Sequence, residues 1–215
     1  MELGKLEPGN FLVINGKRID LTEEQIAGIK DSFRPEGAIP SDMVILSDVK
    51  EAKTFKIGKY EFFVLEQLGD KTAVLFKDLL YDRKQFGSNN NYNGSDVDRL
   101  CNDFAKEIED IVGADNLIEH TVDLTADDGL KCYGSIERKM SLLTTEQYRK
   151  YVYILDEHKL DKWWRLATAF STAKHNDTDW VKCVSPNGRV DDDGCLSNNG
   201  VRPFCILKSN IFVSK

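Results

Sequence analysis

The chain has 215 residues, a formal net charge of −7 and 30% charged residues, a size that suits one domain with an appendage or two small domains. The negative net charge and the absence of a basic stripe in the sequence argue against a protein that binds a nucleic-acid backbone. The longest apolar runs, such as Met43–Leu46 and Phe62–Leu65, are too short to cross a membrane, and the first residues lack the apolar core of a signal peptide.

Residues 1–48 are predicted to form a small N-terminal unit. Two apolar runs flank Asn15-Gly16, which is a signal for a type I′ hairpin turn. A capped helix is expected at 22–33, where Ile26, Ile29 and Phe33 recur at helical spacing. The Pro- and Gly-containing stretch 34–42 then predicts a hinge before a second unit at 52–215.

The second unit begins with a sequence typical of strands and then of a long helix. Three strand-like runs are predicted within 52–80, separated by turn signals at Gly58-Lys59 and Gly69-Asp70. The polar tract 87–96 is loop by composition. A helix with one apolar stripe is expected between Ser95, its N-cap, and Gly113, which ends it.

The rest of the chain is predicted to combine one more helix with loop-rich β structure. Residues 141–155 begin as a strand and change to a helix capped by Thr144 or Thr145. Short strands are expected in "WWRLATAF", "DWVKCV", "GRV" and "GVRPFCIL", and the loops between them are long and polar. Strands, two helices and a loop-rich β end, without βαβ alternation, indicate the α+β class.

Neither a metal site nor catalysis is predicted from the polar side chains. Asp191–Asp193 lack the spacing of an EF-hand, so a solvated turn in which Gly194 has a positive φ is preferred to a calcium loop. The zinc candidates, Cys183, Cys195, Cys205 and His175, are spaced too irregularly, and four of the five cysteines are expected to be buried thiols. No nucleophile elbow or phosphate loop occurs. We expect no catalytic residue, no cofactor and no bound metal.

The tryptophans and Arg202 carry more specific expectations. Trp163 and Trp164 are adjacent in a predicted strand, so one faces the core and the other the opposite side. Trp163 is assigned a structural role, whereas Trp164 and Trp180 are candidates for an exposed ring that stacks on a sugar or an aromatic partner. Arg202 is predicted to be structural, with its guanidinium donating to loop carbonyls or a carboxylate; anion binding is the weaker alternative.

The C-terminal motifs resemble the ending of a known domain. "WWRLATA", "WVKCVSPNGRV" and "GVRPF" are similar to the Trp-Trp-Leu-Arg-Ser-Pro … Gly-Val-Arg-Pro ending of a domain of unknown function that is common in Firmicutes and their phages. Earlier blocks, "KIGKYEFFVLEQ", "YNGSDVDRLCNDF" and "SLLTTEQY", extend the resemblance over about residues 52–208. Two positions depart from the family pattern: Leu-Arg-Ser-Pro is Arg165-Leu166-Ala167-Thr168, and the Trp of the helix motif is Tyr92.

That family is similar to C-type lectin folds of the formylglycine-generating-enzyme type and to the variable proteins of diversity-generating retroelements. The resemblance implies a C-type lectin-like domain: two helices, small antiparallel sheets and a long loop region that presents a ligand surface. The calcium motifs Glu-Pro-Asn and Trp-Asn-Asp are absent, and Cys183 and Cys195 lack the spacing of the enzyme's copper site. The function implied is a non-enzymatic binding module encoded by a phage or prophage, with a retroelement variable protein as its more specific form. A structural or assembly protein of a virion is the alternative, and a metal- or thiol-dependent enzyme ranks third.

The binding surface is expected on polar loops held by rigid strands, which suits adaptable recognition. It should be one contiguous face built from the exposed loops at 171–179, 191–194 and 197–199, with Trp180 or Trp164 near its middle and with Val181, Cys183, Val190 and Val201 as inward anchors. The candidate binding residues are Trp164, Thr172, His175, Asn176, Asp179, Trp180, Asp191, Asp192, Asn198 and Asn199. The expected partner is a protein or a carbohydrate, a homo-oligomer is a further option, and the expected location is the cytoplasm or a virion.

Overall fold

The computed structural model describes residues 11–14, 17–20, 22 and 40–215, and the chain divides into two compact units, Met1–Ser41 and Asp42–Lys215. In the first unit, β1 (Phe11–Ile14) pairs antiparallel with β2 (Lys17–Asp20), with Ile14 opposite Lys17. This pairing confirms the hairpin predicted around Asn15-Gly16. The turn itself, and the helix predicted at 22–33 apart from Thr22, lie outside the described residues.

The second unit, called the main unit here, begins at Asp42, so the predicted boundaries at 48 and 52 are wrong. Strand β3 (Met43–Ile45) pairs with β17 (Phe212–Ser214), and the 3-10 helix η1 (Leu46–Asp48) follows it. Leu46 is fully buried in the hydrophobic core. Residues 43–46, which were predicted to belong to the N-terminal unit, therefore supply an edge strand and a core residue to the main unit.

A large sheet organises the main unit. In the described part of the chain it has eight strands in the order β11-β16-β6-β5-β4-β17-β3, with β8 also beside β16. The strands predicted within 52–80 are confirmed as the antiparallel meander β4 (Thr54–Ile57), β5 (Tyr60–Leu68) and β6 (Lys71–Phe76). The other members are β8 (Leu117–Ile118), β11 (Met140–Ser141) and β16 (Phe204–Lys208).

A second sheet carries most of the predicted loop region. Among the described residues its strand order is β14-β13-β12-β15-β7, and only the β12–β15 pair is parallel. Its strands are β7 (Tyr81–Lys84), β12 (Trp164–Ala169), β13 (Trp180–Val184), β14 (Val190–Gly194) and β15 (Asn199–Val201). A separate antiparallel ribbon pairs β9 (His120–Asp123) with β10 (Ser135–Arg138).

Helix α2 begins and ends, and helix α3 begins, at the residues that their capping signals predict. Helix α2 (Asp96–Val112) starts after Ser95, whose hydroxyl accepts from the Asp98 N–H, and ends at Gly113, which has φ 88°. The 3-10 helix η2 (Ala114–Asn116) follows it. Thr144 and Gln147 form a reciprocal capping box at the start of α3 (Thr145–Lys150), and α4 (Val152–Glu157) continues after a break at Tyr151.

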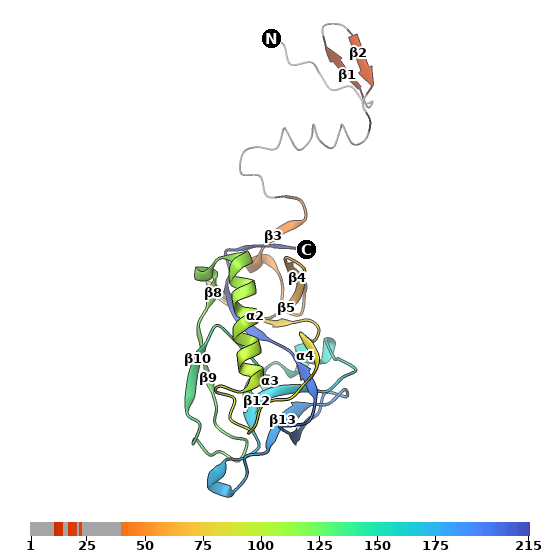
Figure 1. Ribbon diagram of the computed structural model, residues 1–215. Coiled ribbons are helices and arrows are strands. Elements are labelled where there is room, and N and C mark those ends of the chain that lie inside the picture. Colours follow the sequence, from red (N-terminus) through yellow and green to blue (C-terminus); the bar gives the residue numbers. More distant parts are fainter. Residues whose placement is uncertain (1–10, 15–16, 21, 23–39) are drawn as a thin grey trace. The chain divides into compact units, whose positions relative to one another are not determined.

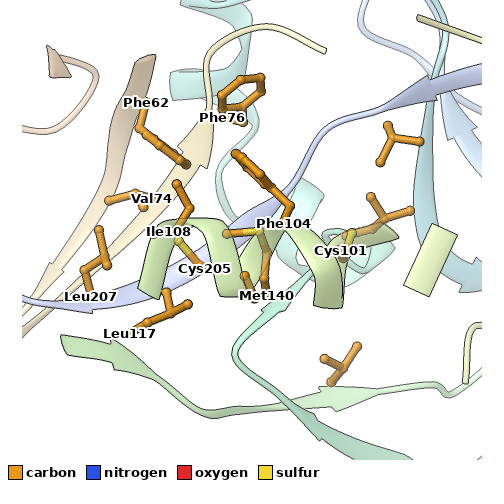
Figure 2. Close-up of a cluster of buried hydrophobic side chains, with 14 of the residues drawn as sticks. Phe62, Val74, Phe76, Cys101, Phe104, Ile108, Leu117, Met140, Cys205 and Leu207 are labelled. Carbon is orange, nitrogen blue, oxygen red and sulfur yellow. The ribbon is translucent and has the colours of Figure 1, made fainter. Parts of the chain in front are cut away.

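Strands β5 and β6 are buried on both faces, which explains their nearly continuous apolar sequence. On one face Phe62, Val74 and Phe76 belong to the same cluster as Phe104 and Ile108 of α2, and Figure 2 shows these side chains between the helix and the sheet. The alternate residues, which include Phe63 and Leu75, pack with Tyr148 and Leu155 of α3 and α4. The large sheet therefore lies between α2 and the α3–α4 segment.

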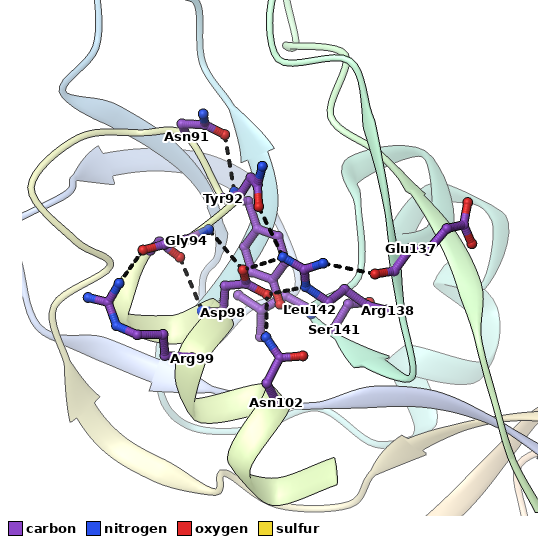
Figure 3. Close-up of polar contacts among 12 residues, drawn as sticks. Asn91, Tyr92, Gly94, Asp98, Arg99, Asn102, Glu137, Arg138, Ser141 and Leu142 are labelled. Atoms are coloured by element: carbon purple, nitrogen blue, oxygen red, sulfur yellow. Dashed lines mark hydrogen bonds and ion pairs between the residues drawn. The ribbon is translucent and has the colours of Figure 1, made fainter. Parts of the chain in front are cut away.

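A buried ion pair joins the start of α2 to the end of β10. Arg138 donates to Asp98 through Nε and Nη2, each at 2.8 Å, and Asp98 also accepts from the Gly94 N–H at 2.9 Å (Figure 3). Asp98 is only 1% exposed. Because the bidentate geometry and the backbone donor satisfy the carboxylate, the charge is tolerated inside and fixes the loop before α2.

The main unit is thus a mixed α+β fold, with two strongly curled sheets and few helices, as the class prediction stated. The loop that carries η3 (Ala173–His175) lies at the end of the main unit opposite β3 and the C-terminus (Figure 1). Across the described residues, no helix combines the length and the apolar character that a membrane span requires.

Candidate binding surface

Two half-exposed aromatic side chains lie on adjacent backbones at the loop-rich end. Phe170 directly follows β12 and is 40% exposed, and Trp180 begins β13 and is 45% exposed. The Phe170 N–H donates to the Trp180 carbonyl at 3.0 Å, so the two segments run side by side. Large apolar side chains held at the surface in this way are typical of recognition sites.

A buried lysine links Phe170 to two carboxylates. Lys182 is 7% exposed, and its Nζ lies 3.6 Å from Asp127 Oδ2 and 3.5 Å from Asp192 Oδ1. The same Nζ lies 5.5 Å from the centroid of the Phe170 ring. Because the two acids balance the ammonium and the ring faces it, Lys182 holds Phe170 in a defined position. We call Phe170, Trp180, Lys182, Asp127 and Asp192 the Trp180 face.

The loop between Phe170 and Trp180 is fixed by Asp128. Its carboxylate accepts from Ser171 Oγ at 2.5 Å and lies 3.0 Å from His175 Nδ1. The Ser171 hydrogen bond, together with the bonds from Leu130 N–H and His175, holds the pKa of Asp128 below its ordinary value against the opposing effect of burial. His175, Asn176 and Asp179 are exposed on this loop, as predicted.

Asn90 anchors three loops from inside. Its side-chain amide donates to the carbonyls of Ser171 and Trp180, each at 3.1 Å, and its Oδ1 accepts from Tyr133 Oη at 2.6 Å. Its backbone N–H donates to the Thr178 carbonyl at 2.7 Å. Asn90 is completely buried. A fully satisfied buried amide of this kind specifies one arrangement of the loops around it.

Arg165 anchors the turn that follows β14, as Asn90 anchors the loops around it. Its guanidinium donates to the carbonyls of Asp193 at 3.0 Å, Gly194 at 2.6 Å and Ser197 at 3.0 Å, and the side chain is completely buried. Desolvation lowers the pKa of Arg165, and the Asp193 carboxylate opposes that effect. Arg165 therefore fixes the turn at 194–197 to β12.

The Asp run forms a strand and not the predicted exposed turn. Asp191–Asp193 lie in β14, opposite Cys183 to Val181 of β13, and Gly194 does not have a positive φ. Burial alone would raise the pKa of Asp193, but hydrogen bonds from Asn199, Ser197 and the Gly194 N–H hold it below its ordinary value. The prediction failed because strand pairing with "WVKCV" outweighs the low strand propensity of Asp.

Three of the predicted binding residues are buried and cannot meet a ligand. Trp164 is 2% exposed and packs against Tyr148, with ring centroids 5.8 Å apart, whereas Trp163, predicted to be structural, is 39% exposed. The prediction that the two tryptophans face opposite sides is correct, but the assignment of the buried one was wrong: Trp164 is buried and Trp163 is exposed. Thr172 is fully buried, where its hydroxyl caps η3, and Asn199 is 6% exposed, with its amide donating to Asp193.

The remaining candidates do not form one contiguous face. Side chains alternate along a strand, so Trp180 and Lys182 share one side of β13 and Cys183 lies on the other. Arg165 of β12 pairs with Cys183, so its side chain lies on the same side of the sheet as Cys183. Because this side chain contacts the 193–197 turn, the turn lies on the side opposite to Trp180. Asn198 is exposed beyond it and lines a cavity with Trp163. The structure therefore separates Asn198 from His175, Asn176, Asp179 and Trp180.

The cysteines are placed as predicted. Cys101, Cys183, Cys195 and Cys205 are buried, Cys132 is exposed, and all are free thiols. Burial raises the pKa of Cys183 to about 12 and that of Cys195 to about 11, so both are protonated at neutral pH. Within the described ranges, no three His, Cys, Asp or Glu side chains are grouped closely enough to hold a metal ion.

Arg202 makes the contacts that the sequence predicted. Its guanidinium donates to the carbonyls of Phe76 at 2.9 Å, Lys77 at 2.7 Å and His158 at 3.1 Å. It also lies 5.2 Å from the ring centroid of Phe63 and 5.3 Å from that of Trp164. Burial lowers the pKa of Arg202 to about 9. The contacts join both sheets to the end of α4.

Sequence reasoning missed Phe170, Lys182, Asn90 and Arg165. Asn90 has the same type as its neighbours Asn89 and Asn91, so no local signal distinguishes the buried amide. Lys182 could have been found, because a lysine between Val181 and Cys183 in a predicted strand needs an acidic partner if it turns inward.

No protein family, curated protein or solved structure that was compared with this chain matches it.

Proposed function

We propose that the main unit is a non-enzymatic binding module that recognises a protein partner through the Trp180 face. The observation that carries the proposal is the pair of half-exposed rings, Phe170 and Trp180, on adjacent backbones that buried polar contacts hold in place. Preorganised aromatic side chains contribute strongly to protein interfaces because little conformational entropy is lost when they bind.

The scaffold that we propose for this module is C-type lectin-like. Three features support it: the terminal strands β3 and β17 pair with each other, helices cover the large sheet, and the loop-rich region lies at the opposite end. A phage or prophage origin, and a place among retroelement variable proteins, follow from the sequence resemblance alone. A reverse-transcriptase gene beside this gene, with a template repeat that matches its 3′ end, would support that origin.

A protein display library tests the binding function. Selection on the immobilised full chain should enrich binders whose dissociation constant rises at least about tenfold when Trp180 is changed to Ala, as expected for a central aromatic. The matched control is Tyr153→Ala, because Tyr153 is a large aromatic that is 85% exposed on α4. Binders that tolerate Trp180→Ala and Phe170→Ala, or that lose affinity equally with Tyr153→Ala, would overturn the proposal.

A further inference from the structure

A cavity lies beside the exposed Trp163. It has a volume of about 370 Å³ and is lined by Asp82, Arg83, Asp161, Lys162, Trp163 and Asn198, with the buried Asn199 at its edge. This volume is in the range of small-molecule sites, which start at about 300 Å³. None of its residues belongs to the Trp180 face.

The strand order of the second sheet brings these distant residues together. Strand β15 lies between β12 and β7, with Gly200 opposite Trp164 and Asn199 opposite Lys84. The Gly200 N–H donates to the Trp163 carbonyl at 2.8 Å. A Cβ at Gly200 would lie 2.9 Å from that carbonyl oxygen and 2.5 Å from Leu79, so only glycine permits this close approach. The backbone of Trp163 is therefore held against Gly200, the middle residue of β15.

Two further contacts fix the rim of the cavity. Lys162 Nζ donates to Asp82 Oδ2 at 2.7 Å, which joins the residue before Trp163 to β7. Asn199 Nδ2 donates to Asp193 Oδ2 at 2.9 Å, which holds the segment that carries Asn198. The residues that line the cavity are therefore joined to one another and to β14 by side-chain contacts.

The chemistry of the lining combines one aromatic surface with both kinds of hydrogen-bonding group. Asp82 and Asp161 are acceptors, Arg83 and Lys162 are donors, and the Asn198 amide is both. Two acidic and two basic side chains leave no net charge. A ligand suited to this lining is uncharged, has one apolar face for the indole and carries several hydroxyls around its edge.

We propose that this cavity is a binding site for a neutral saccharide, with Trp163 as the surface on which a sugar ring stacks. Asp82 and Asn198 accept hydrogen bonds from its hydroxyls, and Arg83 donates to its oxygens. The site is independent of the proposed function, because a protein partner on the Trp180 face and a sugar beside Trp163 use different residues on opposite sides of the second sheet.

Saturation-transfer difference NMR of the full chain tests the site. The probes are maltose, cellobiose, lactose and N,N′-diacetylchitobiose, with glucose 6-phosphate as the charged comparison. At least one neutral disaccharide should receive saturation, and its dissociation constant should rise at least about tenfold in Trp163→Ala. Trp163→Phe should recover part of the affinity, and Trp180→Ala should leave it unchanged.

Three outcomes would overturn the proposal. The first is no transfer to any neutral probe above the level of Trp163→Ala. The second is transfer that Trp180→Ala abolishes as fully as Trp163→Ala, which would place the sugar on the Trp180 face. The third is a preference for glucose 6-phosphate, which would identify an anion site at Arg83 and Lys162. Thermal melting checks that Trp163→Ala is folded. The selection of protein binders described above tests the Trp180 face independently of sugar binding.

Discussion

The side-chain amide of Asn90 donates to the carbonyl of Trp180 at 3.1 Å, across 90 residues of the chain. Asn90→Ala should lower the free energy of unfolding by about 1–3 kcal/mol, because it leaves the buried carbonyl of Ser171 without a donor and removes one of the two donors to the carbonyl of Trp180. Urea denaturation measures this loss. Asn89→Ala, at an exposed position in the same tract, is the control and should stay within about 0.5 kcal/mol of wild type. Equal stability of the two variants would refute the anchoring role of Asn90.

Arg165→Met should release the turn that follows β14. The substitution keeps much of the side-chain volume but removes the donors to Asp193, Gly194 and Ser197. Amide hydrogen exchange over 194–199 should become faster, while exchange in α2 changes little, because local opening is confined to the segment that lost its contacts. Exposed Arg189 provides the comparison variant, Arg189→Met. Unchanged exchange in the turn would contradict the assignment.

Arg202→Ala should lower stability by roughly 3–5 kcal/mol, as for other buried charged networks that lose one member. The loss comes from three carbonyls without a donor and from a gap between Phe63 and Trp164. Arg202→Lys should recover little of the lost stability, since one ammonium group cannot donate to three carbonyls with the geometry of the planar guanidinium. Calorimetric melting temperatures report both effects. A variant that melts like the wild type but loses a ligand would show that Arg202 is a binding residue.

His120 makes stability depend on pH in the acidic range. Its Nε2 lies 3.0 Å from Ser141 Oγ, and burial lowers its pKa to about 4. Because the folded pKa lies below the unfolded value of about 6.5, the neutral ring stabilises the fold fully above that pH. This contribution, up to about 3 kcal/mol, is lost as the pH falls from about 6.5 to about 4.

His120→Gln tests this dependence, since it keeps a polar group near Ser141 and cannot titrate. The urea midpoint of the wild type should fall more steeply between about pH 7 and about pH 4.5 than that of the variant. Parallel curves for wild type and His120→Gln would exclude His120 as the source.

Two deletions locate the start of the main unit. Removing 1–41 should leave a cooperatively folded protein, because that division separates the two compact units. Removing 1–48 also deletes β3 and the fully buried Leu46, and a lost core leucine alone costs about 2–5 kcal/mol. The longer deletion should therefore melt at a clearly lower temperature. Equal melting temperatures would restore the boundary at 48.

Local signals predicted the elements well and their assembly poorly. Ser95, Gly113 and Thr144 mark helix ends through contacts within a few residues, so they can be recognised in the sequence. Whether Trp163 or Trp164 turns inward depends on Tyr148 and Arg202, which are distant in the chain. The cavity beside Trp163 depends on the order of β12, β15 and β7, and no periodicity in one segment shows which strands become neighbours.

Strands β15 and β16 flank Arg202, and each is an interior strand of a different sheet: β15 lies between β12 and β7, and β16 lies next to β6. Both are among the last elements of the main unit to leave the ribosome. Until they emerge, β6 and β12 each present an unpaired edge. Folding of the main unit during synthesis must therefore wait until β15 and β16 have emerged, and until then the incomplete unit exposes these edges to aggregation.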